Sequence, residues 1–197
     1  REELQAAGYV FESDTDTEVM VHLVHHLTTE GMDLFEAVRA AVRRLRGAFA
    51  IAVLRAEEPG VIVGARSGSP LVLGIGFDEH YLASDIHPLL AVTNRFVYLD
   101  EGDVVRLDTT GYQIHDRDDR PVERPVTLAD LDEVGIAKPA GVSDRIDPHR
   151  LVALDRQADR LLAIPSGGDR GLEHLLIVGA FADGDDLVAP AQRRCEG

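Results

Sequence analysis

The sequence predicts an α+β fold in which two helices cover a largely antiparallel sheet. Apolar residues recur at helical spacing in residues 19–27 and again in residues 34–45. From residue 48 onward the apolar residues come in short runs of strand length, which glycine-containing turns separate. Helical segments followed by a series of strand segments favour a layered α+β domain.

The first part of the chain is predicted to be mainly helical. Residues 1–7 have helical composition, and Gly8 is a suitable residue to end that helix. Residues 9–11 form a short apolar run, which predicts a strand. Residues 13–18 are of the kinds that form turns and cap helices, so they are expected to precede the first long helix, which Gly31 ends.

The middle of the chain is predicted to form strands. Residues 48–54 are a continuous apolar run, which suits a strand buried on both faces. Residues 86–91 are expected to form a short helix. The last three runs are expected to form a meander, because Gly102 and Gly111 lie between them. The remaining strands are expected at residues 61–65, 71–76 and 81–83, and the meander at residues 96–99, 103–107 and 112–114.

The character of the sequence changes near residue 121. Nine of the ten aromatic residues lie before it, and aromatic side chains supply much of the buried area of a core. We therefore expect one domain at residues 1–120 and an appendage at residues 121–197, with a helix at 151–164 and a strand at 175–181. The appendage is either a divergent extension that packs as a helix or GC-rich coding sequence read out of frame.

Composition restricts the class of partner. The formal net charge is −15, which disfavours binding to nucleic acid or to an anionic membrane surface. The single cysteine, Cys195, cannot form an internal disulfide or a cysteine-based zinc site, and this suits the cytoplasm. Residues 64–76 contain several glycines but lack the spacing and the lysine of a phosphate-binding loop. No cofactor is expected.

Several motifs, in order and at compatible spacing, carry a family resemblance. They are Gly8-Tyr-Val-Phe-Glu-Ser-Asp-Thr-Asp-Thr-Glu18, Leu45-Arg-Gly-Ala-Phe-Ala-Ile51, Ala65-Arg-Ser-Gly-Ser-Pro-Leu-Val-Leu-Gly-Ile-Gly76, Tyr81-Leu-Ala-Ser-Asp85 and Tyr98-Leu-Asp-Glu-Gly-Asp103. Together they resemble the N-terminal-nucleophile glutamine amidotransferase domain of the glutamine–fructose-6-phosphate aminotransferases (isomerising). The resemblance covers about residues 1–120, and the segment around Arg66 favours this family over the related amidotransferases of purine synthesis.

The resemblance implies an αββα sandwich, of which this chain would form a part. It also implies an enzyme that releases ammonia from glutamine through the thiol of an N-terminal cysteine, with an oxyanion hole. The ammonia passes to a sugar-isomerase domain, and the complete enzyme could be a homodimer. The cysteine, the arginine that binds carboxylate and the oxyanion-hole pair match no position here, so no catalytic residue is assigned, and Cys195 is not in the right context.

One substrate-binding residue carries over from the resemblance. Asp16 matches the carboxylate that holds the α-ammonium group of glutamine, and a charge-assisted hydrogen bond would supply both strength and orientation. Without the resemblance, Asp16 would more often be a helix cap than a ligand. Asp14 is expected to be a turn or cap residue.

Other polar clusters are expected to be structural. His22 and His26 share a helix face at a spacing that can bind a metal, but partly exposed helix histidines are the simpler interpretation, so no metal site is assigned. Arg66 is expected to pair with a carboxylate across the sheet. The arginines at 39, 43, 44 and 46 suggest a solvated face or a partner interface, and residues 116–120 suggest an exposed loop.

Three functional hypotheses follow. The first is a fragment of the glutamine-hydrolysing domain, inactive alone because it lacks the nucleophile; a chain that starts at Arg1 without a preceding cap residue also suggests a fragment. The second is a non-catalytic interaction or regulatory module derived from the enzyme. The third, which the segment around Arg66 disfavours, is an amidotransferase with a different acceptor.

Overall fold

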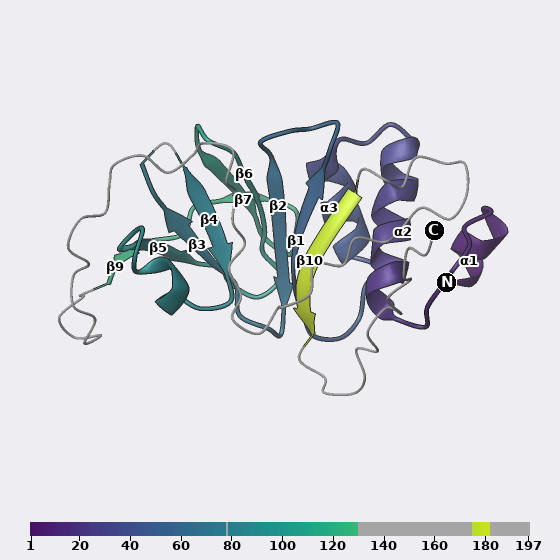
Figure 1. The fold of residues 1–197 in the computed structure, drawn as a ribbon, viewed down its shortest axis with the longest axis horizontal. Coiled ribbons are helices and arrows are strands. Elements are labelled where there is room, and N and C mark those ends of the chain that lie inside the picture. The colour runs from purple at the N-terminus through teal and green to yellow at the C-terminus, as the bar shows by residue number, and fades with distance from the viewer. Residues whose placement is uncertain (78, 130–174, 182–197) are drawn as a thin grey trace, which may run out of the picture.

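The computed structural model describes residues 1–77 and 79–129 in full and the backbone of residues 175–181. The fold is α+β, with two helices on one face of a six-stranded sheet and a four-stranded sheet on the other face (Figure 1). All strand pairs in both sheets are antiparallel. The predicted helix at 151–164 and Cys195 lie outside the described residues.

The helices form the first layer. After the short helix α1 (Glu2–Ala6), helix α2 spans Asp16–Thr29 and helix α3 spans Leu34–Val42. Asp33 caps α3 through a capping box with Glu36, which satisfies backbone N–H groups at the helix start. The predicted strand at 9–11 is wrong: this segment is an irregular connection between α1 and α2.

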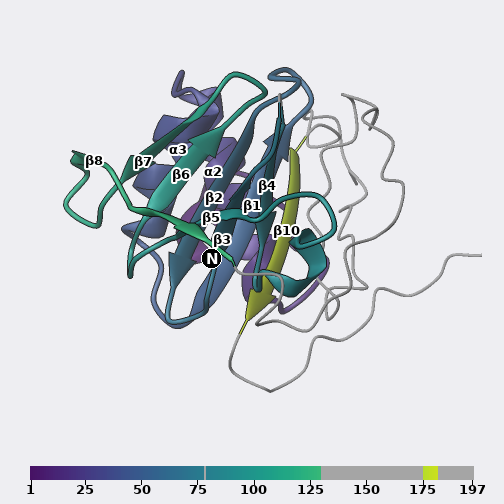
Figure 2. The same cartoon turned by 90° about the vertical axis from the view of Figure 1, so that its left-hand side faces the viewer.

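The six-stranded sheet, called sheet A, has the order β10-β1-β2-β6-β7-β8 (Figure 2). Its strands are β1 (Phe49–Arg55), β2 (Ile62–Ser67), β6 (Val104–Leu107), β7 (Tyr112–His115), β8 (Pro121–Val122) and β10 (Leu175–Phe181). The strand expected at 175–181 is confirmed, and it pairs with β1 over its whole length, from Phe49↔Phe181 to Arg55↔Leu175.

The four-stranded sheet, called sheet B, has the order β4-β3-β5-β9. Its strands are β3 (Val72–Ile75), β4 (His80–Ala83), β5 (Arg95–Tyr98) and β9 (Val126–Leu128), and the short helix expected at 86–91 is the 3-10 turn η1 (His87–Leu89). The predicted meander is wrong in part. Strand β5 pairs with β3 and β9, whereas β6 pairs with β2 and β7, so the chain changes sheets between them.

Burial on both faces of sheet A holds the layers together. Along β1, Phe49, Ile51 and Val53 pack toward the helices, while Ala50 and Ala52 pack toward sheet B. This alternation confirms the prediction of a strand buried on both faces. A further apolar cluster, which includes Leu89 and Phe96, covers the outer face of sheet B beside η1.

The strands of both sheets continue past the domain boundary expected at residue 120. Strand β8 pairs with β7, and β9 pairs with β5. Arg124 also ties this region to the core: its Nε and NH2 donate to Asp103, at 2.9 and 2.8 Å, and Asp103 is fully buried. Residues 121–129 are therefore part of the layered body.

Candidate functional site

The start of α2 is built around Thr15 rather than an aspartate. Thr15 is the N-cap residue, and its side-chain oxygen accepts from the backbone N–H of Glu18 at 3.4 Å. Ser13 Oγ lies 2.8 Å from Thr15 Oγ1, which links the loop to the cap. The interpretation of Asp16 as the capping side chain is therefore wrong, because Asp16 is the first residue inside the helix.

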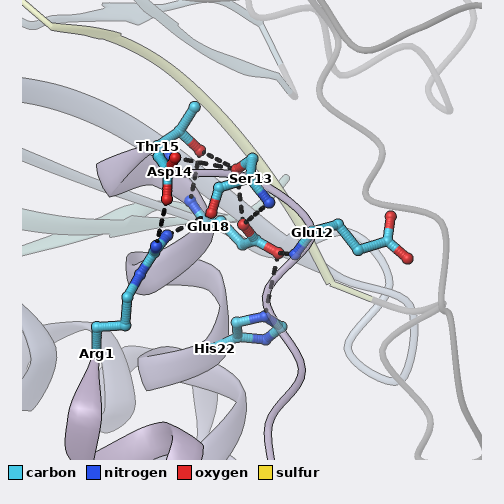
Figure 3. Close-up of polar contacts among 7 residues, drawn as sticks. All are labelled: Arg1, Glu12, Ser13, Asp14, Thr15, Glu18 and His22. Carbon is cyan, nitrogen blue, oxygen red and sulfur yellow. Dashed lines mark hydrogen bonds and ion pairs between the residues drawn. The ribbon is translucent and has the colours of Figure 1, made fainter.

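A buried carboxylate organises the loop that leads into α2 (Figure 3). Glu18 is 3% exposed, and it accepts from the backbone N–H groups of Glu12 and Ser13, at 2.7 and 2.8 Å, and from Ser13 Oγ at 2.6 Å. Burial would raise the pKa of Glu18, but the hydrogen bonds from Ser13 and Glu12 outweigh burial and hold that pKa below its ordinary value.

His22 follows Glu18 by one turn and faces the core. It is 1% exposed, and its ring packs against Tyr9 and Phe11, with centroids 5.0 and 4.6 Å away. Burial lowers the pKa of His22, and the Glu18 carboxylate opposes this only in part. The expectation of partly exposed histidines is thus wrong for His22, whose side chain is a core group.

The other two histidines of α2 are half-buried. His25 Nδ1 lies 2.7 Å from the Tyr9 hydroxyl, and burial lowers the pKa of His25. His26 Nε2 lies 3.5 Å from the exposed carboxylate of Glu30. Within the described part of the chain, no group of three or more His, Cys, Asp or Glu side chains is arranged to hold a metal ion.

Asp14 and Asp16 differ in how they are engaged. Asp14 accepts from Arg1 NH1 at 2.8 Å, and Arg1 also donates to the Ser13 carbonyl oxygen. Asp16 is exposed, and its carboxylate forms no hydrogen bond or ion pair with any described residue. Because it lies in the first turn of α2, the helix dipole favours its negative charge. Asp16 is thus an exposed carboxylate without a partner among the described residues.

Arg66 has the structural role that its place in the sequence predicts. Its NH2 donates to Glu101 Oε2 at 3.3 Å, and its NH1 donates to the Leu99 carbonyl oxygen at 2.8 Å. The glycine-rich segment around it is a strand–turn–strand unit formed by β2 and β3. At Gly64 an added Cβ would lie 2.6 Å from Leu82 Cδ1, so this glycine permits close contact between the sheets.

Of the arginines expected on a solvated face, Arg43, Arg44 and Arg46 are exposed, whereas Arg39 is largely buried. Arg39 is 17% exposed in its side chain, stacks on Phe35 at 4.6 Å and donates to Asp119 at 2.6 Å. Arg43 pairs with Asp119 as well, at 3.1 Å. Residues 116–120 form the exposed turn that the sequence predicts.

Of the helices that the structure describes, none has the length and apolar character needed to cross a membrane.

Comparison with known proteins identifies the domain type. Residues 1–91 match the family model described as "Glutamine amidotransferase domain". Residues 1–91 of this chain belong to the glutamine amidotransferase domain family. The motifs at Gly8–Glu18, Leu45–Ile51 and Ala65–Gly76 all lie within this range, so the family resemblance drawn from them is confirmed.

Curated relatives of this amidotransferase domain share one name, "Glutamine--fructose-6-phosphate aminotransferase [isomerizing]". The protein from Idiomarina loihiensis is 50% identical over 131 residues, which are 66% of this chain and 22% of that protein. The protein from Bordetella pertussis is 56% identical over 124 residues, which are 63% of this chain and 20% of that protein. The chain thus spans about a fifth of the length of these relatives.

Among solved structures, the chain is similar to the glutamine phosphoribosylpyrophosphate amidotransferase from B. subtilis, complexed with ADP and GMP. The TM-score is 0.48 at 20% sequence identity, over 59% of this chain and 25% of that chain.

Sequence reasoning missed Glu18 as the organiser of this amidotransferase segment. The signal was present, because Thr15-Asp-Thr-Glu18 has the spacing of a capping box. Thr15 makes its half of that box, but Glu18 turns to the backbone N–H groups of Glu12 and Ser13 instead of that of Thr15. Spacing identifies the pair, and only the path of the loop decides which N–H groups Glu18 reaches.

Proposed function

We propose that this chain provides the part of a glutamine amidotransferase site that holds the α-ammonium group of glutamine, with Asp16 as the binding carboxylate. The observation that carries the proposal is the state of the three carboxylates between residues 14 and 18. Asp14 pairs with Arg1 and Glu18 is saturated by loop donors, whereas Asp16 is exposed and unengaged among the described residues. An ammonium group requires an anion that is not already paired with another cation.

The Glu18 network supports this role by fixing the loop in front of Asp16. Three hydrogen bonds to one buried carboxylate hold residues 12 and 13 against the first turn of α2. A loop held in this way keeps the first turn in one conformation before a ligand arrives, which lowers the entropy cost of binding.

The complete reaction is proposed from the relatives' printed name: ammonia from glutamine is used to aminate fructose 6-phosphate, and a sugar-isomerase domain is the partner of this domain. The residues described here contain no cysteine, and the single cysteine of the chain, Cys195, is not N-terminal. We therefore expect this chain alone to release no ammonia from glutamine.

The test measures binding and turnover separately. Saturation-transfer NMR should show contact with glutamine and a much weaker signal from glutaramate, the same molecule without its α-ammonium group. Asp16→Asn should remove this preference, and the matched control Asp14→Asn should keep it. Equal signals from the two compounds in the unsubstituted chain would disprove the role of Asp16, and ammonia release in a coupled glutamate dehydrogenase assay would disprove the inactivity.

A second candidate function is a non-catalytic interaction or regulatory module. It is favoured by one observation, the pairing of β10 with β1, which covers an edge of sheet A with a strand of the same chain. A monomer that unfolds cooperatively, combined with no preference for glutamine over glutaramate, would select this second candidate.

A further inference from the structure

A cavity of about 420 Å³ lies at one end of sheet A, apart from the start of α2. It is formed where the C-terminal end of α3 meets the ends of β1, β2 and β6 and the turn between β7 and β8. Four arginines from three separate segments line it: Arg39, Arg43, Arg66 and Arg117. No residue of the loop and cap around Asp16 lines this cavity.

The acidic groups of the cavity wall are already engaged. Glu101 accepts from the Gly68 N–H at 2.9 Å and from Ser67 Oγ at 3.0 Å, in addition to Arg66. Asp119 bridges Arg39 and Arg43. The backbone of Asp119 is in the left-handed region, with φ of 67°.

The third acidic residue of the cavity wall, Asp116, stabilises the turn in which it lies. Its Oδ1 accepts from the backbone N–H groups of Asp118 and Arg120, both at 2.9 Å. The carboxylates therefore neutralise part of the charge of the four arginines through fixed contacts.

Some arginine donors of the cavity lining have no partner in the part of the chain that the structure describes. The Nε atoms of Arg39 and Arg66 are buried and form no hydrogen bond with the described residues. The Arg117 guanidinium forms no hydrogen bond or ion pair in the same part of the structure. The Gly68 N–H is the main cause of the lowered pKa of Glu101, and the nearby Arg117 charge lowers that pKa further. Buried N–H groups without partners are rare in native proteins and favour a ligand that accepts from them.

We propose that this arginine cavity binds a small phosphate-class anion, either inorganic phosphate or a phosphate monoester. Guanidinium groups that come from different directions suit an anion with several equivalent oxygens, and arginine is the side chain best matched to phosphate geometry. The volume lies within the range of small-molecule sites. Since the whole chain carries a net charge of −15, general attraction does not bring anions to it, and the local arginines must do so.

The test is a titration of the chain with inorganic phosphate and, separately, with fructose 6-phosphate, followed by calorimetry and by NMR of the arginine Nε–H groups. We expect saturable binding at millimolar concentrations and shifts of the Arg39 and Arg66 Nε–H signals. Arg117→Gln should weaken binding about tenfold, since it removes one charge-assisted contact. Arg120→Gln, in the same turn but outside the cavity lining, should change it less than twofold, by the small size of exposed charge effects.

The two ligands distinguish the source of the anion. Tighter binding of fructose 6-phosphate indicates a phosphorylated metabolite, and equal binding indicates free phosphate; both support the proposal. Absence of saturable binding, unchanged Arg39 and Arg66 signals, equal losses in the two arginine variants, or acetate that binds as well as phosphate would each overturn it.

Discussion

Glu18 Oε1 lies 3.6 Å from His22 Nε2, one turn apart on α2, and both side chains are almost completely buried. Glu18 gathers the loop before the helix, and His22 packs against the aromatic residues Tyr9 and Phe11 of the preceding segment. The pair thus joins the loop that leads to Asp16 to the apolar core.

Replacing the buried carboxylate should destabilise the fold. Glu18→Gln keeps the size of the side chain but substitutes an amide NH2 for one acceptor oxygen. Either the Glu12 N–H, or the Ser13 N–H together with the Ser13 hydroxyl, then loses its partner. The expected loss is about 2 kcal/mol in the free energy of unfolding, measured by urea denaturation. Glu30→Gln, on the exposed end of the same helix, should change stability by less than about 0.5 kcal/mol. Equal losses in both variants would contradict the role given to Glu18.

Stability should fall in two stages as the solution is acidified. The pKa values of His22 and His25 are lowered in the folded state, so the unfolded chain binds protons first, and stability is lost as pH falls below about 6.5. The pKa of Glu18 is lowered too, so its contribution is present above about pH 4.5 and is lost as pH falls toward its folded value.

Urea denaturation at pH 7.5, 6.5, 5.5, 4.5 and 3.5 checks both stages of this pH dependence. A His22→Gln, His25→Gln double variant should lose the decline between pH 6.5 and 5.5 and keep the decline below it. A double variant with the same pH profile as the unsubstituted chain would show that other groups control the first stage.

Local pattern predicted the elements of this fold better than their pairing. The helix predicted from the apolar stripe in residues 19–27 and the strand predicted from the apolar run of β1 both form where expected. Each of these patterns matches the side-chain periodicity and burial of the element that it predicts. The change of sheet between β5 and β6 has no such signal. The sheet that each strand joins depends on the apolar cluster into which its side chains pack. These clusters exist only once the layers are assembled.

The residues of the candidate site were likewise predicted only in part from the sequence. Asp16 could be singled out from the sequence because it lies within a family motif. For Arg66 the sequence predicted an ion pair with a carboxylate, but it did not identify the partner, which is Glu101. The strand expected at residues 9–11 does not form. Tyr9 and Phe11 pack against His22 of α2 instead, so this segment needs no strand partner. The arginine cavity could not be predicted, since it joins residues 39 and 117 from distant parts of the chain.

The close approach of the two sheets makes Gly64 sensitive to any side chain. A Cβ at this position would lie 2.6 Å from Leu82 Cδ1 and 3.1 Å from Val105 Cγ1. Gly64→Ala should therefore cost about 1–3 kcal/mol of unfolding free energy through overpacking, measured by thermal and urea denaturation. Gly111→Ala, where no atom lies within 4 Å of the added Cβ, is the matched control and should be tolerated. A fully stable Gly64→Ala chain would show that the sheets are farther apart.

The contact between Arg124 and Asp103 should stabilise the attachment of residues 121–129 to the core. Arg124→Met leaves the fully buried carboxylate of Asp103 without its cation, at an expected cost of about 3 kcal/mol. The double variant Asp103→Asn, Arg124→Met should recover part of that loss, which a double-mutant cycle measures. Arg120→Met, in the exposed turn nearby, is the control. An unchanged unfolding free energy for Arg124→Met would show that this contact does not stabilise the fold.

Deletion of residues 175–181 should expose the edge of sheet A. Strand β1 is paired on one side with β2 and on the other with β10, so removal of β10 leaves a row of backbone N–H and C=O groups without partners. Since β1 is apolar on both faces, such an edge favours pairing with a second copy of the chain. Light scattering after size-exclusion chromatography should show concentration-dependent association of the deletion variant. Deletion of residues 182–197 is the control and should leave the oligomeric state unchanged. A deletion variant that stays monomeric with unchanged stability would mean that β10 does not protect the edge, and the module interpretation would lose its support.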